Sequence, residues 1–205
     1  MENAQNKSLK NFFLSNKKIL YLSIGLLFLI IIFFWWSDSS NKKERFKNSE
    51  DFISAKVLIS KNDKRNSLEI LKSLILKNDD VYSPLSLFLI IDNNLENNKE
   101  KILDYFDKIL AIKSLKKEDL NLIRLKKAIY ISENANEEDI LNLLNPILNS
   151  DSVWRHKCLK LLGDYYFNNK KYNKAKQYYS DLLLLDDGSI DASDIKKKMK
   201  KIKND

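Results

Sequence analysis

Apolar residues recur at helical spacing through most of the chain, and short polar runs rich in Asn, Asp and Lys interrupt them. Apolar positions three and four residues apart mark one face of a helix. Most of the polar connections have only two to six residues, which joins neighbouring helices as antiparallel hairpins. The pattern predicts helices over residues 42–60, 65–77, 83–97, 99–112, 117–132, 137–148, 152–168, 172–185 and 191–203.

The first apolar segment, residues 19–36, differs because it has no polar face and no charged residue. A helix over this segment is about 27 Å long, close to the roughly 30 Å of a bilayer's hydrocarbon core. It ends in Trp35 and Trp36, and indole rings favour the membrane interface. The segment therefore predicts a transmembrane anchor, with a tail over residues 1–18 before it and a helical domain over residues 37–205 after it.

A cleaved signal peptide is the alternative for this segment. The apolar core of a signal peptide usually has about 7–15 residues and is followed by small residues at the cleavage site. Here the core is longer and ends in bulky aromatic residues, which favours an uncleaved anchor. Basic residues on the two sides balance, but two lysines abut the start of the segment, which favours a cytoplasmic N-terminus. The basic residues are Lys7, Lys10, Lys17 and Lys18 before it, and Lys42, Lys43, Arg45 and Lys47 after it.

Residues 159–187 have the spacing of one tetratricopeptide unit, two helices whose small residues meet. Gly163 lacks a Cβ atom, so it lets a second helix come close, and Ala175 does the same from that helix. The alternative is an ordinary helix pair whose spacing matches by chance. The residues at the repeat positions are Leu159, Leu162, Gly163, Tyr166, Ala175 and Tyr179.

Three earlier helix pairs carry weaker copies of the second half of this unit. The residues in the place of Ala175 are Ser67, Ile102 and Ile140, so the four positions are 35, 38 and 35 residues apart. The residues in the place of Tyr179 are Leu71, Phe106 and Leu144. Repeats of this kind have a period of 34 residues and need about three copies for stability. The predicted fold is all-α, a single transmembrane helix followed by a short tetratricopeptide-like α-solenoid of about four hairpins and a C-terminal capping helix.

Composition agrees with this fold class, because the chain has only 3 Gly and 2 Pro. The net charge is +8, but the basic residues are spread among 28 acidic ones, so no nucleic-acid partner is expected. The last predicted helix sets Ile195, Met199 and Ile202 at helical spacing among lysines. This pattern indicates a helix that caps the solenoid, and the alternative is binding to anionic lipid or RNA.

Catalytic and metal-binding patterns are nearly absent. His156 is the sole histidine, which excludes motifs with two histidine ligands, and Cys158 two residues later points away from it on a helix. Cys158 is also the sole cysteine, so no internal disulfide forms and a small core residue is expected. We predict no enzyme activity, no cofactor and no metal; a hydrolase with a carboxylate site on the solenoid is the catalytic alternative.

The first helix of each hairpin lines the concave face of a tetratricopeptide solenoid. In residues 154–168, a stripe of four residues spaced by 3, 4 and 3 lies away from the predicted hairpin contact. We predict that this stripe is a protein-binding face. The alternative is that it packs on the neighbouring hairpin or on the C-terminal helix. The four residues are Lys157, Lys160, Asp164 and Phe167.

The order of tail, anchor and helical hairpins resembles a known family. The stretch 144–187, with Pro146, Trp154-Arg155, Leu161-Leu162, Ala175 and Asp186, is similar to the closing segment of the ancillary SecYEG translocon subunits in their α-proteobacterial form. Residues 49–75 resemble the first hairpin of that family. These proteins are tetratricopeptide-like and reside in the bacterial inner membrane.

The resemblance implies a single-pass protein of the bacterial inner membrane, with a cytoplasmic N-terminus and a periplasmic helical domain. It also implies partners, namely the Sec translocon, periplasmic chaperones and chains that emerge from the channel. The expected function is an interaction module that links secreted proteins to chaperones. A structural adaptor in envelope assembly or cell division is the alternative, because the same type of groove serves either role.

Overall fold

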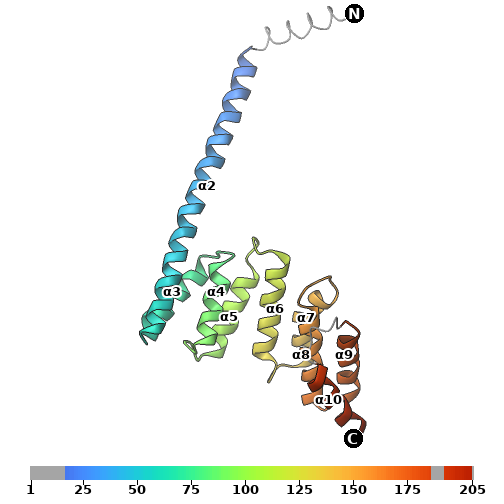
Figure 1. The fold of residues 1–205 in the computed structure, drawn as a ribbon. Coiled ribbons are helices and arrows are strands. Elements are labelled where there is room, and N and C mark those ends of the chain that lie inside the picture. Colours follow the sequence, from blue (N-terminus) through green and yellow to red (C-terminus); the bar gives the residue numbers. More distant parts are fainter. Residues whose placement is uncertain (1–16, 186–191, 205) are drawn as a thin grey trace, which may run out of the picture. The chain divides into compact units, whose positions relative to one another are not determined.

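The computed structural model describes residues 17–185 and 192–204, and every regular element within them is an α-helix (Figure 1). The predicted all-α class is therefore confirmed for this part of the chain. The helices are α2 (Lys17–Ser60), α3 (Lys64–Leu76), α4 (Tyr82–Asp92), α5 (Lys99–Leu110), α6 (Lys117–Ile131), α7 (Glu137–Leu148), α8 (Arg155–Asn168), α9 (Tyr172–Leu184) and α10 (Ala192–Asn204).

The chain divides into two units, Met1–Ile53 and Ser54–Asp205. In the first unit, α2 exposes large apolar side chains whose exposed fractions run from 43% to 74%. They are Tyr21, Leu22, Leu26, Leu27, Phe28, Leu29, Ile30 and Ile32. No helix within the described residues is both long enough and apolar enough to cross a membrane. The predicted anchor includes residues 19–20, 23–24, 31 and 33–36, whose side chains lie outside the described set, so it stays a prediction.

The segment predicted as an anchor and the helix predicted over residues 42–60 lie on one helix, α2. The polar run between them, residues 37–41, contains Ser, Asp and Asn but neither Gly nor Pro. Ser, Asp and Asn disfavour a helix interior only modestly, whereas Pro breaks it. The helix therefore continues through a stretch that the change in polarity marked as a boundary.

The second unit is a row of antiparallel helix pairs, solenoid-like in its order of contacts (Figure 1). Each helix from α3 to α10 packs on the next one along the chain. Three of the second helices of these pairs begin with a side-chain cap: Asp63, Asn98 and Asn136 accept a hydrogen bond from the backbone N–H three residues later. These caps fix where each of the three helices begins, because each satisfies a backbone N–H group that has no partner within the helix.

The helix bounds agree with the predicted ones within a few residues, with two larger differences. Helix α4 ends at Asp92 and not near residue 97, because Asn94 takes a left-handed backbone conformation (φ 50°) that stops the helix. Helix α8 begins at Arg155 and not at 152. The residues before it are held by α6, since Glu118 Oε2 accepts hydrogen bonds from Ser152 Oγ at 2.8 Å and Val153 N at 3.2 Å.

The six predicted repeat positions of the last hairpin are all buried, and the five other than Gly163 belong to one hydrophobic core that α10 also enters. Gly163 lies against the ring of Tyr179. A Cβ atom on residue 163 would lie 2.5 Å from Tyr179 Cδ1 and closer still to Cε1. The sequence predicted close approach at Gly163, and the structure shows that an aromatic ring, not the facing backbone, occupies the space.

The weaker copies follow the same burial pattern. The residues predicted in the places of Ala175 and Tyr179 are all at most 1% exposed: Ser67, Leu71, Ile102, Phe106, Ile140 and Leu144. Twelve residues before Ser67 and Ile140, at the place that Gly163 takes in the last hairpin, Ala55 and Ala128 are fully buried. Ser67 Oγ donates a hydrogen bond of 3.0 Å to the carbonyl oxygen of Ala55. Small residues thus meet across the first pair, whereas in the last pair Gly163 meets the ring of Tyr179.

Candidate functional site

The predicted binding stripe lies on α8, but its four residues do not form one free surface. Lys157 is exposed, and its Nζ lies 5.3 Å from the centroid of the Trp154 ring. Phe167 is half-buried with its ring 5.8 Å from that of Tyr172 at the start of α9. Lys160 Nζ lies 2.6 Å from Asp164 Oδ2. The stripe therefore has an exposed end at Lys157 and a half-buried, internally paired centre.

Asp164 is the centre of a polar network that joins three helices. Besides Lys160, it accepts hydrogen bonds at Oδ1 from Tyr179 of α9 and from Lys198 of α10, each at 2.7 Å. Burial by itself would raise the pKa of Asp164, but the three hydrogen bonds outweigh burial and lower the pKa below its usual range. The alternative considered for the stripe was packing on the neighbouring hairpin or on the C-terminal helix. Asp164 agrees with this alternative, because it accepts a hydrogen bond from Lys198 of the C-terminal helix α10.

Asp164 also lines a cavity between α8 and the residues that directly follow α6, which we call the α6–α8 cavity. The cavity has a volume of about 300 Å³. Tyr165 closes one side, with its hydroxyl donating to the carbonyl oxygen of Ala135 at 3.1 Å. Asn168 is exposed at the rim, and its side chain makes none of the polar contacts found among the described residues. The lining residues are Ser132, Glu133, Leu161, Asp164, Tyr165, Asn168 and Asn169.

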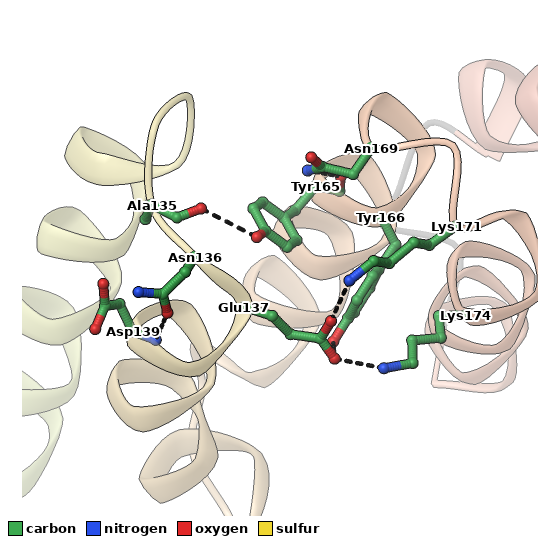
Figure 2. A network of polar contacts seen from close by, with 9 residues as sticks. All are labelled: Ala135, Asn136, Glu137, Asp139, Tyr165, Tyr166, Asn169, Lys171 and Lys174. Carbon is green, nitrogen blue, oxygen red and sulfur yellow. Dashed lines mark hydrogen bonds and ion pairs between the residues drawn. The ribbon is translucent and has the colours of Figure 1, made fainter.

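A second network couples the third hairpin to the fourth (Figure 2). Glu137, the first residue of α7, accepts hydrogen bonds from Lys171 Nζ at 2.5 Å and Tyr166 Oη at 2.9 Å, and it also pairs with Lys174. These contacts lower the pKa of Glu137 to about 2, with the hydrogen bond from Lys171 as the largest cause. The lysines lie 34 and 37 residues after Glu137, about one repeat later. No local motif marks this network, so only the repeat register could have predicted it.

Aromatic packing completes the joint around Glu137. The rings of Tyr166 and Tyr178 stack at 5.3 Å between centroids, and Lys174 Nζ lies 5.2 Å from the centroid of the Tyr166 ring. Burial and the hydrogen bond to Glu137 raise the pKa of Tyr166 above its usual value. Tyr166 therefore stays protonated and acts as a hydrogen-bond donor, which is a structural role.

Two further cavities lie on the other side of the hairpin joints, where second helices meet. One of about 420 Å³ lies among α5, α6 and α7, and the other of about 390 Å³ lies among α7, α8 and α9. Apolar side chains such as Leu103, Ile131 and Leu143 line the larger one, with Lys99 and Asp139 at its edge. The larger cavity lies at the starts of α5 and α7 and the end of α6, whereas the other lies at the ends of α7 and α9 and the start of α8.

The residues considered for catalysis are not arranged for it in the described part of the chain. Cys158 is fully buried, and burial raises the pKa of its thiol to about 12, so it is protonated at neutral pH. His156 is half-buried on the same helix. No group of three His, Cys, Asp or Glu side chains within the described residues could hold a metal ion. Two carboxylates with a lowered pKa, Glu137 and Asp164, are both held by lysine and tyrosine side chains, most of them from other helices.

Comparisons with protein-family models, with curated proteins and with solved structures found no match for this chain.

Proposed function

We propose that this chain is a membrane-anchored protein-interaction module built on tetratricopeptide-type repeats. The observation that carries the proposal is the α6–α8 cavity, because it lies on the first helix of the last hairpin, and first helices line the ligand-binding face of such solenoids. The burial of all six repeat positions in the last hairpin supports the repeat type. Stacked hairpins with a continuous first-helix face bind extended or helical segments of other proteins.

The polar chemistry of the described residues favours binding over turnover. Carboxylates whose pKa is shifted by a specific partner are often catalytic, but Glu137 and Asp164 bind lysines and tyrosines that, apart from Lys160, lie on or at the start of other helices and so join the helices together. The cavity between α6 and α8 instead offers Glu133 and Asn168 at an exposed rim with apolar Leu161 beside them. A rim of this kind recognises a peptide by its backbone and charge.

Anchoring is supported by the apolar side chains of α2 within residues 21–32. Exposing such a run of Leu, Ile and Phe to water is unfavourable by about 25 cal/mol per Å² of apolar surface, whereas a hydrocarbon environment removes this cost. We therefore propose that residues 19–36 span a bacterial inner membrane, with the N-terminus in the cytoplasm and the helical unit in the periplasm. Extraction of membranes at alkaline pH tests the anchor, since a spanning protein stays in the pellet. A reporter fused after residue 205 that is active only outside the cytoplasm tests the orientation.

The sequence resemblance supplies the proposed partners, the Sec translocon with periplasmic chaperones or emerging chains. Affinity purification of the full chain in mild detergent tests this, and recovery of translocon subunits or chaperones is expected. The variant Asn168→Arg places a long side chain over the α6–α8 cavity without removing a described polar contact. It should reduce recovery of the partner, while the control Asn149→Arg at the α7–α9 cavity should not.

Three results would redirect the proposal. Recovery of neither translocon subunits nor chaperones, alongside a positive control, would contradict the Sec assignment. A stable partner from envelope assembly or division would favour the structural adaptor. Equal recovery by both Asn variants would remove the α6–α8 cavity as the binding face.

A further inference from the structure

Helix α10 has two faces with opposite character. Its apolar face joins the core of the last hairpin, where Ile195 is fully buried and Met199 and Ile202 are half-buried. At 3.6 residues per turn, four lysines occupy the arc opposite this apolar face. All four are exposed, and we refer to them as the lysine face: Lys196, Lys197, Lys200 and Lys201.

The acidic groups near α10 are used by a different lysine. Lys198 Nζ lies 2.7 Å from Asp164 Oδ1 and 2.9 Å from Asp194 Oδ2, which ties α10 to α8 and to its own first turn. No carboxylate of the described residues lies within ion-pair distance of the lysine face. Among the described residues, four positive charges on one side of α10 therefore have no acidic partner.

Two lysines on other helices show a different arrangement from the lysine face. Lys108 pairs with Asp104 and Lys160 with Asp164, in each case four residues apart. On the lysine face the residues four apart are like charges, Lys196 with Lys200 and Lys197 with Lys201. Like charges at this spacing destabilise a helix, so α10 keeps them at a cost in stability.

We propose that the lysine face binds the surface of a bilayer rich in anionic lipid. Lysine is a compact point charge that needs no fixed geometry from its partner, which suits mobile lipid headgroups. Helix α10 has no arginine for bidentate phosphate contacts and no aromatic residue on which bases could stack, both common in nucleic-acid binding. The choice of a bilayer as the source of the anions rests on the proposed membrane anchoring.

The packing of α10 also fixes the mode of binding. Amphipathic helices that insert into a membrane bury their apolar face among the lipids. Here the apolar face of α10 is occupied by the core around α8 and α9. Binding is therefore electrostatic adsorption without insertion, and it weakens steeply as salt shortens the screening length.

A binding assay in trans tests the proposal with the full chain. The protein is held in nanodiscs of phosphatidylcholine and mixed with separate sedimentable vesicles, made either of phosphatidylcholine alone or with added phosphatidylglycerol. Sedimentation with the anionic vesicles only, lost at about 0.5 M salt, is expected. The variant Lys196→Gln, Lys200→Gln should weaken binding by about fivefold per lysine, roughly 25-fold in total.

The control removes the same charge elsewhere, through Lys113→Gln and Lys116→Gln, two exposed lysines outside α10. It should bind about as well as the unchanged chain. Circular dichroism should be the same for all three proteins, because the substituted side chains make no described polar contact. Thermal unfolding should not occur at a lower temperature in either variant, and removing the like-charge pair of Lys196 and Lys200 should raise it slightly.

Equal binding to both vesicle types, equal loss in the control, or binding that survives high salt would each overturn the proposal. Tighter binding of a single-stranded uridine oligonucleotide, with the same dependence on Lys196 and Lys200, would overturn it in favour of RNA. The assay does not depend on the anchor, because a chain that does not insert into nanodiscs can be mixed with the same vesicles without them and sedimented. Failure of the anchor appears instead in alkaline extraction, so the two failures are distinguishable.

Discussion

The ring of Tyr179 occupies the place where a Cβ atom on residue 163 would lie. The contact between the two helices at this point therefore depends on glycine at position 163. The ring cannot easily move aside, because its hydroxyl donates to Asp164 at 2.7 Å. A glycine in a helix interior costs about 1 kcal/mol relative to alanine, so the chain gives up helix propensity to keep this contact.

We predict that Gly163→Ala destabilises the protein despite the better helix propensity of alanine. Overpacking a buried contact costs about 1–3 kcal/mol, which exceeds the propensity gain over most of this range. Chemical denaturation of the full chain in detergent measures the change. In a double-mutant cycle with Tyr179→Leu, the alanine should cost less or become stabilising, since the ring that it meets is gone. An alanine that stabilises the protein with Tyr179 present would show that the ring contact is not limiting.

The fold could be predicted largely because its signals are local. Asp63, Asn98 and Asn136 cap helices from their own sequence neighbourhood, and the starts of the helices after them were predicted within one residue. The early end of α4 was not predicted. Apolar spacing gives no sign of the left-handed backbone conformation of Asn94, which belongs to the turn after the helix. Repeat spacing identified both Gly163 and Tyr179 and predicted that the tyrosine fills space around the glycine, and the structure places the Tyr179 ring directly against Gly163.

The polar networks could not be predicted in the same way, because their members come from different repeats. Asp164 and Lys160 were placed on one stripe by helical spacing, and they do pair. Their further partners, Tyr179 and Lys198, belong to α9 and α10 and share no spacing rule with α8. Glu137 and Lys171 meet only because two hairpins stack with a register of about one repeat. Side-chain chemistry across such a joint follows from tertiary packing alone.

Glu137 should make the stability of the protein depend on pH in the acidic range. Its pKa falls from an ordinary value of 4.5 to about 2 in the folded protein. Because the folded pKa is the lower one, the stabilisation is fully present above about pH 4.5 and is lost as the pH falls toward 2. The side chain is partly exposed to solvent, so we expect Glu137→Gln to cost about 1 kcal/mol or less at neutral pH.

The measurement compares unfolding free energies of Glu137→Gln and the unchanged chain at several pH values. The difference should shrink between about pH 4.5 and 2. Glu138→Gln is the matched control, because its neighbouring side chain is exposed and makes none of the described ion pairs. A pH-independent difference would mean that Glu137 acts through packing and not through its charge.

Cys158 should be unreactive in the folded protein. It is fully buried, and burial raises the pKa of its thiol to about 12, so the reactive thiolate is scarce at neutral pH. Iodoacetamide should label it only after denaturant unfolds the helical unit, with labelling followed by mass spectrometry. Because it is the sole cysteine, the labelled fraction reports directly on opening of the last hairpin. Rapid labelling under native conditions would contradict the buried position.

Asp164→Asn should release α10 from the last hairpin. The carboxylate accepts hydrogen bonds from Lys160, Tyr179 and Lys198, and an amide accepts at one atom only. Hydrogen bonds to a charged group contribute about 1.5–3 kcal/mol each when buried, and the partial exposure of Asp164 reduces this, so a loss of about 1–3 kcal/mol is expected. Hydrogen exchange should rise first in residues 192–204, because Lys198 is the polar link that ties α10 to α8. The control Asp181→Asn changes an exposed carboxylate on α9 and should leave that exchange unchanged.

If α10 exchanges equally slowly in both variants, its apolar residues Ile195, Met199 and Ile202 hold it without the ion pair. The same variant would separate docking from charge in vesicle binding, since it frees the helix while leaving the lysine face intact.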